Sequence, residues 1–322
     1  MSLSIGLIGT GGFSKVHADI LTTMDGVSVK AFVGTSLDKA EKAAQGYASA
    51  KGYGDIEHML DAAKPDAVYV CVPPFAHGEI ERKLVERGIP FLVEKPLGIN
   101  LEAPQEILKG VTSSGLITSV GYHLRYTDAA LKAVEVLRDR KTGMALGYWM
   151  GNMPLVSWWR KQDGSGGQFI EQTTHMVDML RFLLGEVDEV YAAFAQRAMH
   201  EIHDGVTVPD VGTVTLKLKS GAVATISNTC MLPTSEKVGL AIYTDQGSVD
   251  VLMDKLIVKE NSGSVEYPNI ANAYQRENEA FIHAVRTGDT SGILSSYEDA
   301  FKTMEITYAA QQSAETGMPV KL

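Results

Sequence analysis

The first part of the chain, up to about residue 122, alternates short apolar runs with stretches of helical periodicity. The apolar runs are bounded by turn residues, as buried parallel strands are, and cover residues 4–8, 27–33, 67–72, 90–93 and 117–121. The helical stretches between them cover residues 37–47, 56–63, 77–87 and 101–114. Strict alternation of strand and helix predicts βαβ crossovers, and therefore an α/β Rossmann domain with a doubly wound parallel sheet at residues 1–122.

The pattern changes from about Tyr126. A helix at 128–138, a strand at 145–150, a glycine-rich loop at 164–167 and a helix at 169–184 come first. Six strand-like runs then follow one another at residues 187–195, 211–218, 222–229, 238–243, 248–252 and 255–258. Consecutive strands predict an α+β second domain, residues 123–322, with a large, open, mostly antiparallel sheet. Helices at 271–287 and 297–315 close the chain.

Composition and charge narrow the function classes. The 322 residues suffice for two domains, and the formal net charge is −10. An acidic chain is not attracted to nucleic acid or to an anionic membrane, so we expect neither as a partner. No apolar segment approaches the roughly 18 residues needed to cross a bilayer.

The two cysteines favour a reducing compartment. Cys71 lies in an apolar run, Cys230 follows Ile-Ser-Asn-Thr, and their spacing matches no metal or redox motif. We interpret both as core or near-core thiols. Together with an N-terminus that lacks a basic leader, this predicts a cytoplasmic protein.

The stretch Gly9-Thr10-Gly11-Gly12-Phe13 follows the first predicted strand and opens a helix. This context fits a dinucleotide-binding turn, in which Gly9 permits the tight turn and Gly11 the approach of a pyrophosphate to the helix N-terminus. Ser14 stands where a third glycine or alanine is usual. The alternative is a strand-to-helix turn without a ligand.

The end of the second strand bears on the choice of cofactor. NAD-preferring sites usually carry a carboxylate there for the ribose 2′-hydroxyl, whereas this chain has Thr35 and Ser36, with Lys39 nearby. We expect NAD or NADP, and this pattern favours NADP. Two alternatives stay open: Asp38 could reach the ribose, and Lys39 could simply be solvated at the helix start.

Two further segments follow parallel strands. Val72-Pro73-Pro74 leads to His77, and Glu94-Lys95-Pro96 follows the strand at 90–93. Doubly wound sheets bind ligands at the carboxyl ends of their strands, so we expect the Lys95 ammonium to point into that crevice. The alternative is that Glu94 and Lys95 form a surface ion pair.

A second group of candidates lies near the glycine-rich loop. Glu171 and His175 are four residues apart on the helix predicted at 169–184, so they are expected to share a face, with Asp178 three residues further on. The alternative is a structural histidine. A metal held by these three residues lacks support from a second histidine or a cysteine cluster, and we expect no metal.

At this point the sequence resembles the Gfo/Idh/MocA oxidoreductases over its whole length. The matching motifs, in chain order, are Gly9 to Gly12 with His17, Pro73-Pro74 with His77, Glu94-Lys95-Pro96, Gly121-Tyr122 to Arg125, Gly166-Gly167 through Glu171, His175 and Asp178, and the tail Ser313 to Val320. Each motif is weak by itself, but their order and spacing together are specific.

The resemblance implies NAD(P)-dependent redox chemistry on a sugar or polyol. It also implies an open C-terminal sheet used for assembly, here into a homodimer or homotetramer. The catalytic lysine and histidine of the family correspond to Lys95 and His175, and Glu171 stands where aspartate is common. The expected cofactor-binding residues are Gly9, Thr10, Gly11, Gly12, Phe13, Thr35, Ser36, Lys39, Val72, Pro73, Pro74, His77, Glu94 and Lys95.

These assignments suggest how the side chains would act. His175 would take the hydroxyl proton, since an ordinary histidine pKa of about 6.5 suits transfer near neutrality. Lys95 would stabilise the developing alkoxide, and Glu171 would orient Lys95 or bind a substrate hydroxyl. Tyr122, Trp159 and Arg160 are candidates for the substrate wall, and a core or surface role is the alternative for each.

Two rival functions stay open. The same scaffold supports glycoside cleavage through transient oxidation with NAD regenerated in each cycle. A non-catalytic dinucleotide-sensing protein is the other, although a sensor need not keep Lys95, Glu171 and His175.

Overall fold

The computed structural model describes residues 2–322 and divides into two compact units. Unit 1 consists of residues 2–98, Glu102–Gly121 and Tyr274–Phe301. Unit 2 consists of Ile99–Leu101, Tyr122–Ala273 and Lys302–Leu322. This division differs from the expected second domain at 123–322, because residues 274–301 are part of unit 1.

Unit 1 is built on a parallel sheet. Its strands are β1 (Leu3–Ile8), β2 (Val27–Val33), β3 (Lys51–Tyr53), β4 (Ala67–Val70), β5 (Phe91–Val93) and β6 (Thr118–Val120). Their spatial order is β3-β2-β1-β4-β5-β6, and every neighbouring pair is parallel. The doubly wound sheet is therefore confirmed. Strand β3 was not predicted, because its three residues are too few to show a period.

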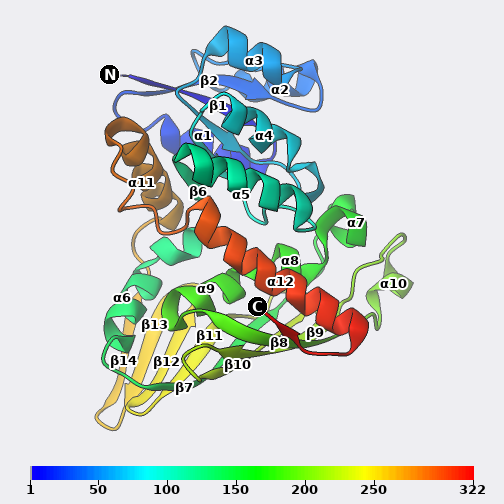
Figure 1. Cartoon of the computed structure of the whole chain (residues 1–322), viewed down its shortest axis with the longest axis vertical. Helices are drawn as coiled ribbons and strands as arrows, with labels where there is room; N and C mark the ends of the chain where they lie inside the picture. The colour runs from blue at the N-terminus through cyan, green and yellow to red at the C-terminus, as the bar shows by residue number, and fades with distance from the viewer. Residues whose placement is uncertain (1) are drawn as a thin grey trace. The chain divides into compact units, whose positions relative to one another are not determined.

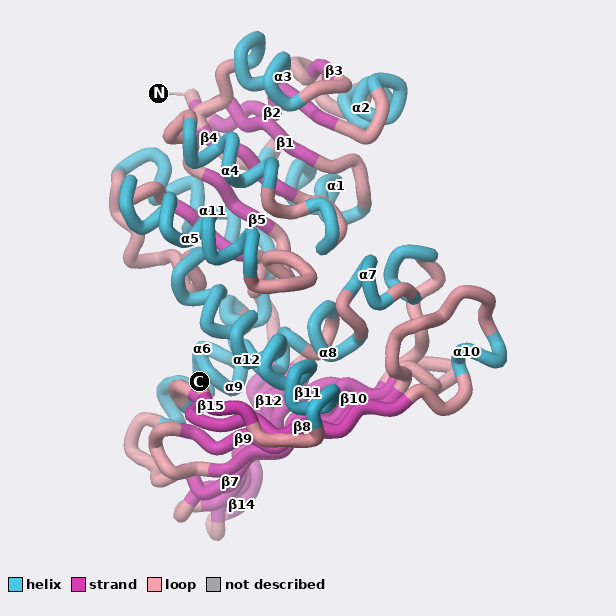
Figure 2. Tube along the Cα trace, turned by 45° about the vertical axis from the view of Figure 1, so that its right-hand side comes forward, coloured by secondary structure: helices cyan, strands magenta, loops and turns pink. Residues whose placement is uncertain are grey.

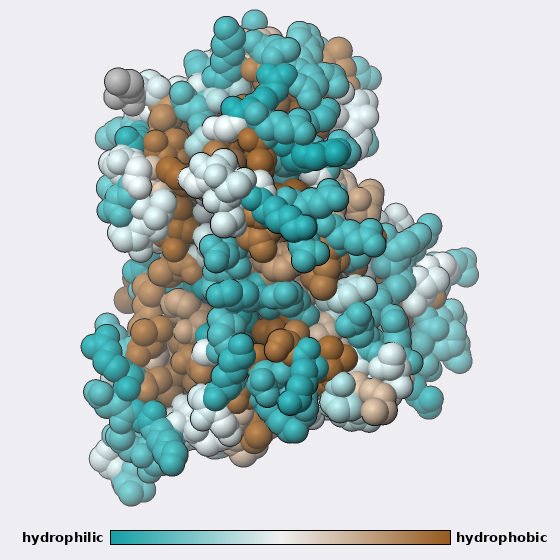
Figure 3. Space-filling view, in the orientation of Figure 1, coloured by the Kyte–Doolittle hydropathy of each residue, from teal (hydrophilic) through white to brown (hydrophobic). Residues whose placement is uncertain are grey.

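Helices connect these strands and supply the rest of the core of unit 1. They are α1 (Gly12–Leu21), α2 (Leu37–Ala44), α3 (Ile56–Ala63), α4 (Glu79–Glu86), α5 (Glu102–Ser114) and α11 (Ala273–Thr287). Phe281 and Ile282 of α11 pack with Leu7 and Phe32 of the strands in one buried cluster. The outer faces are polar, and Figure 3 shows a mostly hydrophilic surface over α2 and α3.

Unit 2 is built on a larger sheet. Its strands are β7 (Thr142–Met150), β8 (Val187–Ala195), β9 (Val211–Leu218), β10 (Val223–Thr229), β11 (Lys237–Thr244), β12 (Gly247–Leu252), β13 (Lys255–Glu260), β14 (Gly263–Pro268) and β15 (Val320–Lys321). The order is β14-β13-β12-β11-β7-β10-β9-β8-β15. Among the described strands of this sheet, only β7 and β10 pair in parallel, which confirms the mostly antiparallel sheet.

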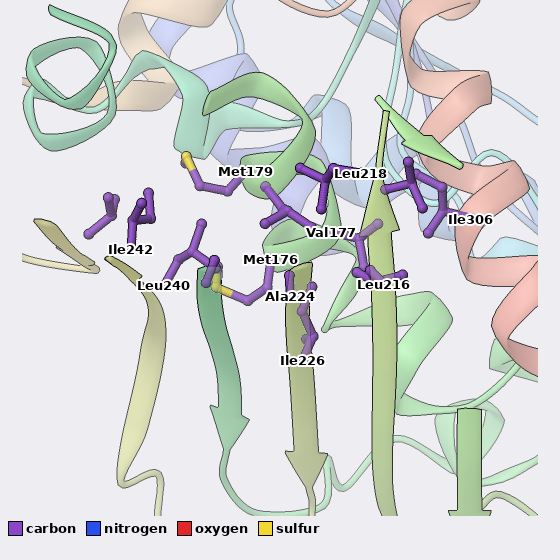
Figure 4. Packing of buried hydrophobic residues seen from close by; sticks show 14 of the residues in the cluster. Met176, Val177, Met179, Leu216, Leu218, Ala224, Ile226, Leu240, Ile242 and Ile306 are labelled. Atoms are coloured by element: carbon purple, nitrogen blue, oxygen red, sulfur yellow. The ribbon is translucent and has the colours of Figure 1, made fainter. Parts of the chain in front are cut away.

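One face of this sheet is covered by helices (Figures 1 and 2). The helices of unit 2 are α6 (Asp128–Leu137), α7 (Gln162–Ser165), α8 (Gln168–Glu171), α9 (Thr174–Leu184), α10 (Met199–Ile202) and most of α12 (Tyr297–Thr316). Figure 4 shows side chains of α9, such as Met176 and Met179, packed among those of the strands, such as Leu240. Burial of this apolar layer is the main stabilising contribution in unit 2.

The other face of the sheet exposes apolar side chains at the alternate strand positions. Met144 is opposite Tyr243 on β11 and Val223 on β10, and Leu146 lies two positions along β7. These four side chains are 37–47% exposed. The open face therefore carries a contiguous apolar row, of a kind that often marks an interface.

The helix predicted at 169–184 is not continuous. Helix α8 ends at Glu171, the Thr173 backbone N–H donates to the carbonyl of Gln168 (2.9 Å), and α9 begins at Thr174. Glu171 and His175 therefore lie on two different helices, and the prediction that they share one helix face was wrong.

Both cysteines lie in or near a core, as predicted. Cys71 is half-buried and Cys230 is buried, and both thiols are free. Burial raises the pKa of the Cys71 thiol well above its ordinary value and that of Cys230 to about 12. Of the helices in residues 2–322, none has the length and apolar character to span a membrane.

Candidate functional site

The predicted cofactor-binding segments of unit 1 meet at one edge of its sheet. The chain leaves β1 at Gly9, whose N–H donates to the Val33 carbonyl at the end of β2 (2.9 Å). Glu94, just after β5, donates its N–H to the Val70 carbonyl at the end of β4 (2.8 Å). Because all six strands are parallel, their carboxyl ends form a single edge, and β1 lies at its switch point between β2 and β4.

The glycine turn after β1 is tight on one side and open on the other. Gly9 has a φ of 114°, and a Cβ there would lie 2.1 Å from the Cys71 carbonyl oxygen, so only glycine fits. A Cβ on Gly11 or Gly12 would meet no atom within 4 Å. Helix α1 begins at Gly12 with no side-chain cap and no acidic residue in its first turn. Its free N–H groups fit a dinucleotide pyrophosphate.

Ser14 does not weaken this turn. Its side chain is buried, and its hydroxyl donates to the carbonyl of Gly9 (2.9 Å). A small residue lets α1 lie close to β1, and the hydroxyl fastens the helix to the turn. The Ser14 hydroxyl therefore uses its donor within the turn.

A lysine lies near the end of β2, and the strand terminus carries no carboxylate. The Lys39 ammonium donates to the Thr35 hydroxyl (3.0 Å), and the Ser36 hydroxyl caps α2 by accepting from the Lys39 N–H (3.4 Å). Asp38 is exposed in the first turn of α2. Lys39 is thus held at the strand end, where the 2′-position of a bound ribose is usually recognised.

The segment after β4 combines a buried histidine with an exposed aromatic ring. The His77 imidazole pairs through Nδ1 with Glu81 (2.6 Å), whose other oxygen accepts from the Gly78 N–H (2.7 Å). His77 thus orders the start of α4, a role that sequence reasoning missed. Phe75 is 51% exposed and Phe13 is 49% exposed. Only Phe13 was expected at the site, and the exposure of Phe75 adds it as a candidate.

Glu94 is buried and does not lie on the surface. Its side chain pairs with the buried His17 (Nε2 to Oε1, 3.0 Å). A Cβ on Gly121 would lie 2.7 Å from the Glu94 carboxylate, so glycine there makes room for it. Lys95 follows directly, joined to Pro96 by a cis peptide bond.

In unit 2, His175 lies within an aromatic cage. Its ring is stacked on Trp149 (5.9 Å between centroids, 18° between planes) and meets the rings of Tyr122 (5.8 Å) and His123 (5.2 Å) edge-on. The Tyr122 hydroxyl is hydrogen-bonded to Thr174 (2.8 Å), and burial raises its pKa. His123 and Trp149 were missed, although strand alternation in β7 indicated which face Trp149 occupies.

Glu171 is held by Trp159. The indole N–H of Trp159 donates to one oxygen of the Glu171 carboxylate (2.6 Å). Trp159 is 1% exposed and belongs to a hydrophobic cluster with Met153 and Cys230. The structure therefore corrects the expected substrate wall: Trp159 is a core residue that positions Glu171.

The other two wall candidates differ from each other. Tyr122 is 1% exposed, and its hydroxyl is already bonded to Thr174, so it also supports the site from within. Arg160 is half-buried, and its Nε donates to the Pro154 carbonyl (3.4 Å). Of the three candidates, Arg160 has the most accessible polar group.

Asp178 belongs to a buried ion pair. Its carboxylate accepts two hydrogen bonds from Arg125 (2.6 and 2.7 Å) and one from the Thr303 hydroxyl (3.1 Å). The Arg125 guanidinium also lies over the Phe182 ring (5.1 Å). Within residues 2–322 there is no group of three or more histidine, cysteine or acidic side chains that could hold a metal.

Two protein-family models match the chain. The first, "Oxidoreductase family, NAD-binding Rossmann fold", matches residues 3–122, and the second, "Oxidoreductase family, C-terminal alpha/beta domain", matches residues 141–322. Between them the matches cover most of both units.

Known proteins of similar sequence or structure match over nearly their whole length. Myo-inositol 2-dehydrogenase of Thermotoga maritima is 24% identical (99% of this chain, 98% of that protein), and D-glucoside 3-dehydrogenase of Escherichia coli is 27% identical (99% and 97%). The WlbA dehydrogenase of Bordetella pertussis, solved in complex with NADH and UDP-GlcNAcA, shares the fold with a TM-score of 0.87 at 20% identity, covering 100% and 99%. The chain therefore belongs to the Gfo/Idh/MocA family of oxidoreductases.

Proposed function

We propose that this protein transfers a hydride between a nicotinamide cofactor and a secondary alcohol of a sugar, polyol or inositol-like substrate. The observation that carries the proposal is the turn at Gly9 to Gly12, which is closed against Cys71 but open above Gly11 and Gly12 at the start of α1. The family of the chain and the names of its inositol and glucoside dehydrogenase relatives support the substrate class.

The cofactor supplies the redox chemistry, since a bound nicotinamide accepts or returns the hydride at its C4. The protein must move the proton. In the direction of oxidation, we propose that His175 accepts the hydroxyl proton while the C–H bond gives up its electron pair as hydride, which leaves a ketone. The Trp149 and Tyr122 rings hold the imidazole in one orientation, as a general base requires.

Lys95 and Glu171 complete the proposed machinery. The Lys95 ammonium would donate a hydrogen bond to the substrate oxygen and stabilise the negative charge that develops there. Glu171, with one oxygen fixed by Trp159, would bind a neighbouring hydroxyl or orient Lys95. We also propose that Arg160 contacts the substrate, because guanidinium groups bind hydroxyl pairs and carboxylates well.

A preference for NADP is part of the proposal. The Lys39 ammonium lies 3.0 Å from the Thr35 hydroxyl, where an NAD-specific site usually has a carboxylate. A cation at this place attracts a 2′-phosphate, and no acidic residue at the strand terminus repels one. The NADH in the WlbA structure is a property of that protein and does not decide the preference of this one.

The test is a panel of sugars, polyols and inositols, each mixed with the protein and NAD or NADP, with reduced cofactor followed by its ultraviolet absorbance. We expect steady reduction with at least one polyol or sugar, faster with NADP. Sugar release without net reduction would instead support cleavage of glycosides through transient oxidation. Tight cofactor binding without turnover of any substrate would support a dinucleotide sensor and contradict the proposal.

We also propose that the chain assembles as a homodimer or homotetramer through the open face of the nine-stranded sheet. Met144, Leu146, Val223 and Tyr243 form the centre of that face and are each more than a third exposed. Burial of such a row contributes about 25 cal/mol for each square ångström removed from water.

A further inference from the structure

The buried side chain of His17 joins three segments of unit 1 that are far apart in the sequence. His17 lies on α1, Glu94 follows β5, and Asn278 lies on α11. The three residues are 0%, 4% and 0% exposed, respectively. The proposed hydride transfer gives His17 no role. A polar side chain buried at such a junction needs hydrogen-bond partners that compensate for its burial.

Both ring nitrogens of His17 have a partner. The Asn278 amide nitrogen donates to the Tyr274 carbonyl (2.7 Å), and it lies 2.9 Å from Nδ1 of His17. The Asn278 amide oxygen is farther from Nδ1, at 3.2 Å. These distances favour an imidazole that accepts at Nδ1 and donates its Nε2–H to Oε1 of Glu94 (3.0 Å). His17 is therefore a hydrogen-bond donor to the Glu94 carboxylate.

Packing and a backbone hydrogen bond fix this pair from both sides. The rings of Tyr69 and Tyr274 lie 5.2 and 5.9 Å from the imidazole of His17, measured between centroids. The backbone N–H of Glu94 donates to the Val70 carbonyl at the end of β4 (2.8 Å). Buried polar groups that are bonded in this way favour a single arrangement of their neighbours. Glu94 therefore cannot shift relative to α1 without losing its bond to His17.

The pair connects the cofactor turn to Lys95. Three residues before His17 on α1, the Ser14 hydroxyl fastens the helix to the carbonyl of Gly9 (2.9 Å). One residue after Glu94 comes Lys95, the proposed donor to the substrate oxygen. Any shift of Glu94 relative to α1 would thus also move the backbone of Lys95 relative to the turn.

Stability alone is a weak reason for a buried histidine and carboxylate. Removal of a carboxylate from water costs free energy, and its pairing in the interior often recovers that cost only in part. Well-packed apolar side chains of similar volume are often at least as stabilising. Hydrogen bonds, however, require a defined geometry of their partners. The pair is therefore better suited to fixing a position than to stabilising the fold.

We propose that His17 is a positioning residue, whose hydrogen bond to Glu94 holds the backbone of Lys95 in place beside the cofactor turn. This role rests on the proposed function, in which Lys95 donates to the reacting oxygen. A misplaced donor stabilises the developing negative charge less well. Loss of the bond should therefore lower kcat while the affinity for the cofactor changes little.

Two amide variants of His17 separate this role from packing. A glutamine side chain places its NH₂ close to the position of Nε2 and keeps a donor to Glu94, whereas asparagine reaches only the position of Nδ1. On the best substrate of the panel, we expect His17→Asn to lower kcat by about 10-fold or more, and His17→Gln to stay within about three-fold of the wild type. The dissociation constant of reduced cofactor should change by less than about three-fold in both variants.

A double-mutant cycle shows whether His17 acts through Lys95. In the Lys95→Ala background, His17→Asn should lower kcat/KM by less than about two-fold further. A residue that acts independently of Lys95 would lower it by the same factor as in the wild-type background. The positioning role is overturned if that factor recurs, if His17→Asn keeps the wild-type kcat, or if both amide variants lose kcat equally.

Hydrogen–deuterium exchange of the cofactor-free protein tests the same role without a substrate. The peptide that contains Glu94 and Lys95 should exchange faster in His17→Asn than in the wild type, whereas strand β1 should exchange at the same rate in both. Equal rates for that peptide would overturn the role. If no substrate of the panel is turned over, the proposed function fails, and the exchange rates alone decide whether His17 holds this segment.

Discussion

An added methyl group should have different effects at two glycines of the turn after β1: it should destabilise the fold at one and weaken cofactor binding at the other. At Gly9 it would lie 2.1 Å from the Cys71 carbonyl oxygen, at a φ that side chains avoid, so Gly9→Ala should destabilise the fold by about 2 kcal/mol or more. At Gly11 it would meet no protein atom within 4 Å. Gly11→Ala should therefore keep the wild-type melting temperature and weaken binding of reduced cofactor by about 10-fold or more, since only the pyrophosphate needs that space.

Thermal unfolding and a fluorescence titration with NADH and NADPH measure the two effects. Wild-type affinity in a folded Gly11→Ala protein would show that no cofactor approaches this turn. Comparing Gly9→Ala with Gly11→Ala therefore distinguishes a turn that serves only the fold from a turn that also binds the cofactor.

Lys39 should decide between the two cofactors. Lys39→Ala removes the cation beside Thr35, so it should raise the KM for NADP by about 10-fold and leave that for NAD nearly unchanged. Lys42→Ala, an exposed lysine of the same helix, is the matched control. Equal changes for both cofactors, or no change, would contradict the proposed preference for NADP.

At the scale of elements, Asp210 ties the start of α10 to β9. Its buried carboxylate accepts from the backbone N–H groups of Arg197, Ala198 and Met199, each at 2.8 Å. Burial alone would raise the pKa of this carboxyl, but the three N–H groups outweigh burial and lower it. The stabilisation is thus fully present above the unfolded pKa of about 3.9, and it is lost as the pH falls through the folded value.

Asp210→Asn should therefore lower the free energy of unfolding at neutral pH and flatten its decline below about pH 4. Urea unfolding across that pH range gives both quantities. Glu201→Gln, at an exposed position of α10, serves as the control that should change neither. A variant whose acid profile parallels that of the wild type would show that Asp210 does not contribute as described.

The elements with a clear period were predictable, and those defined by tertiary contacts were not. Strands β2, β8 and β9 begin and end where alternation or apolar runs place them. Strand β14 was missed because nearly all of its residues are exposed, which removes the alternation. The break between α8 and α9 had a weak signal in Thr173 and Thr174, two poor helix formers, but the bond from Thr174 to Tyr122 that accompanies it is not visible in the sequence.

The residues of the candidate site were also predictable only in part. Segments at strand ends could be placed from the parallel topology alone, and the glycine turn and Lys95 were selected in this way. The partners of the site residues come from distant positions: Glu94 with His17, Glu171 with Trp159, and Asp178 with Arg125. A single sequence does not indicate such pairs, so it left open whether Trp159 lines the substrate or lies in the core, and the structure places it in the core.

For the whole molecule, the order of the chain is not the order of its compact units. Helix α11 follows all but the last strand of the large sheet, yet its Phe281 and Ile282 lie in the core of unit 1. The apolar spacing of α11 predicted a helix but could not show which core it joins. A chain cut at residue 122 would lack this helix, and we expect unit 1 to require it for a complete core.

Assembly is also a property of the whole molecule. Leu146→Glu places a charge in the middle of the open sheet face, where Leu146 is 37% exposed and flanked by Ala241 and Thr225. Light scattering should give a multiple of the chain mass for the wild type and the mass of one chain for this variant. Val134→Glu on α6, similarly exposed, should leave the assembly intact. Wild-type assembly in Leu146→Glu would place the interface elsewhere.

The central claim is that Lys95 and His175 act on the same substrate oxygen during hydride transfer. The most direct measurement compares kcat/KM for Lys95→Ala, His175→Ala and the wild type on the best substrate of the panel, with cofactor affinity measured in parallel. We predict that each variant loses activity by about a thousand-fold while it binds the cofactor nearly as the wild type does. Turnover close to that of the wild type in either variant would contradict the account.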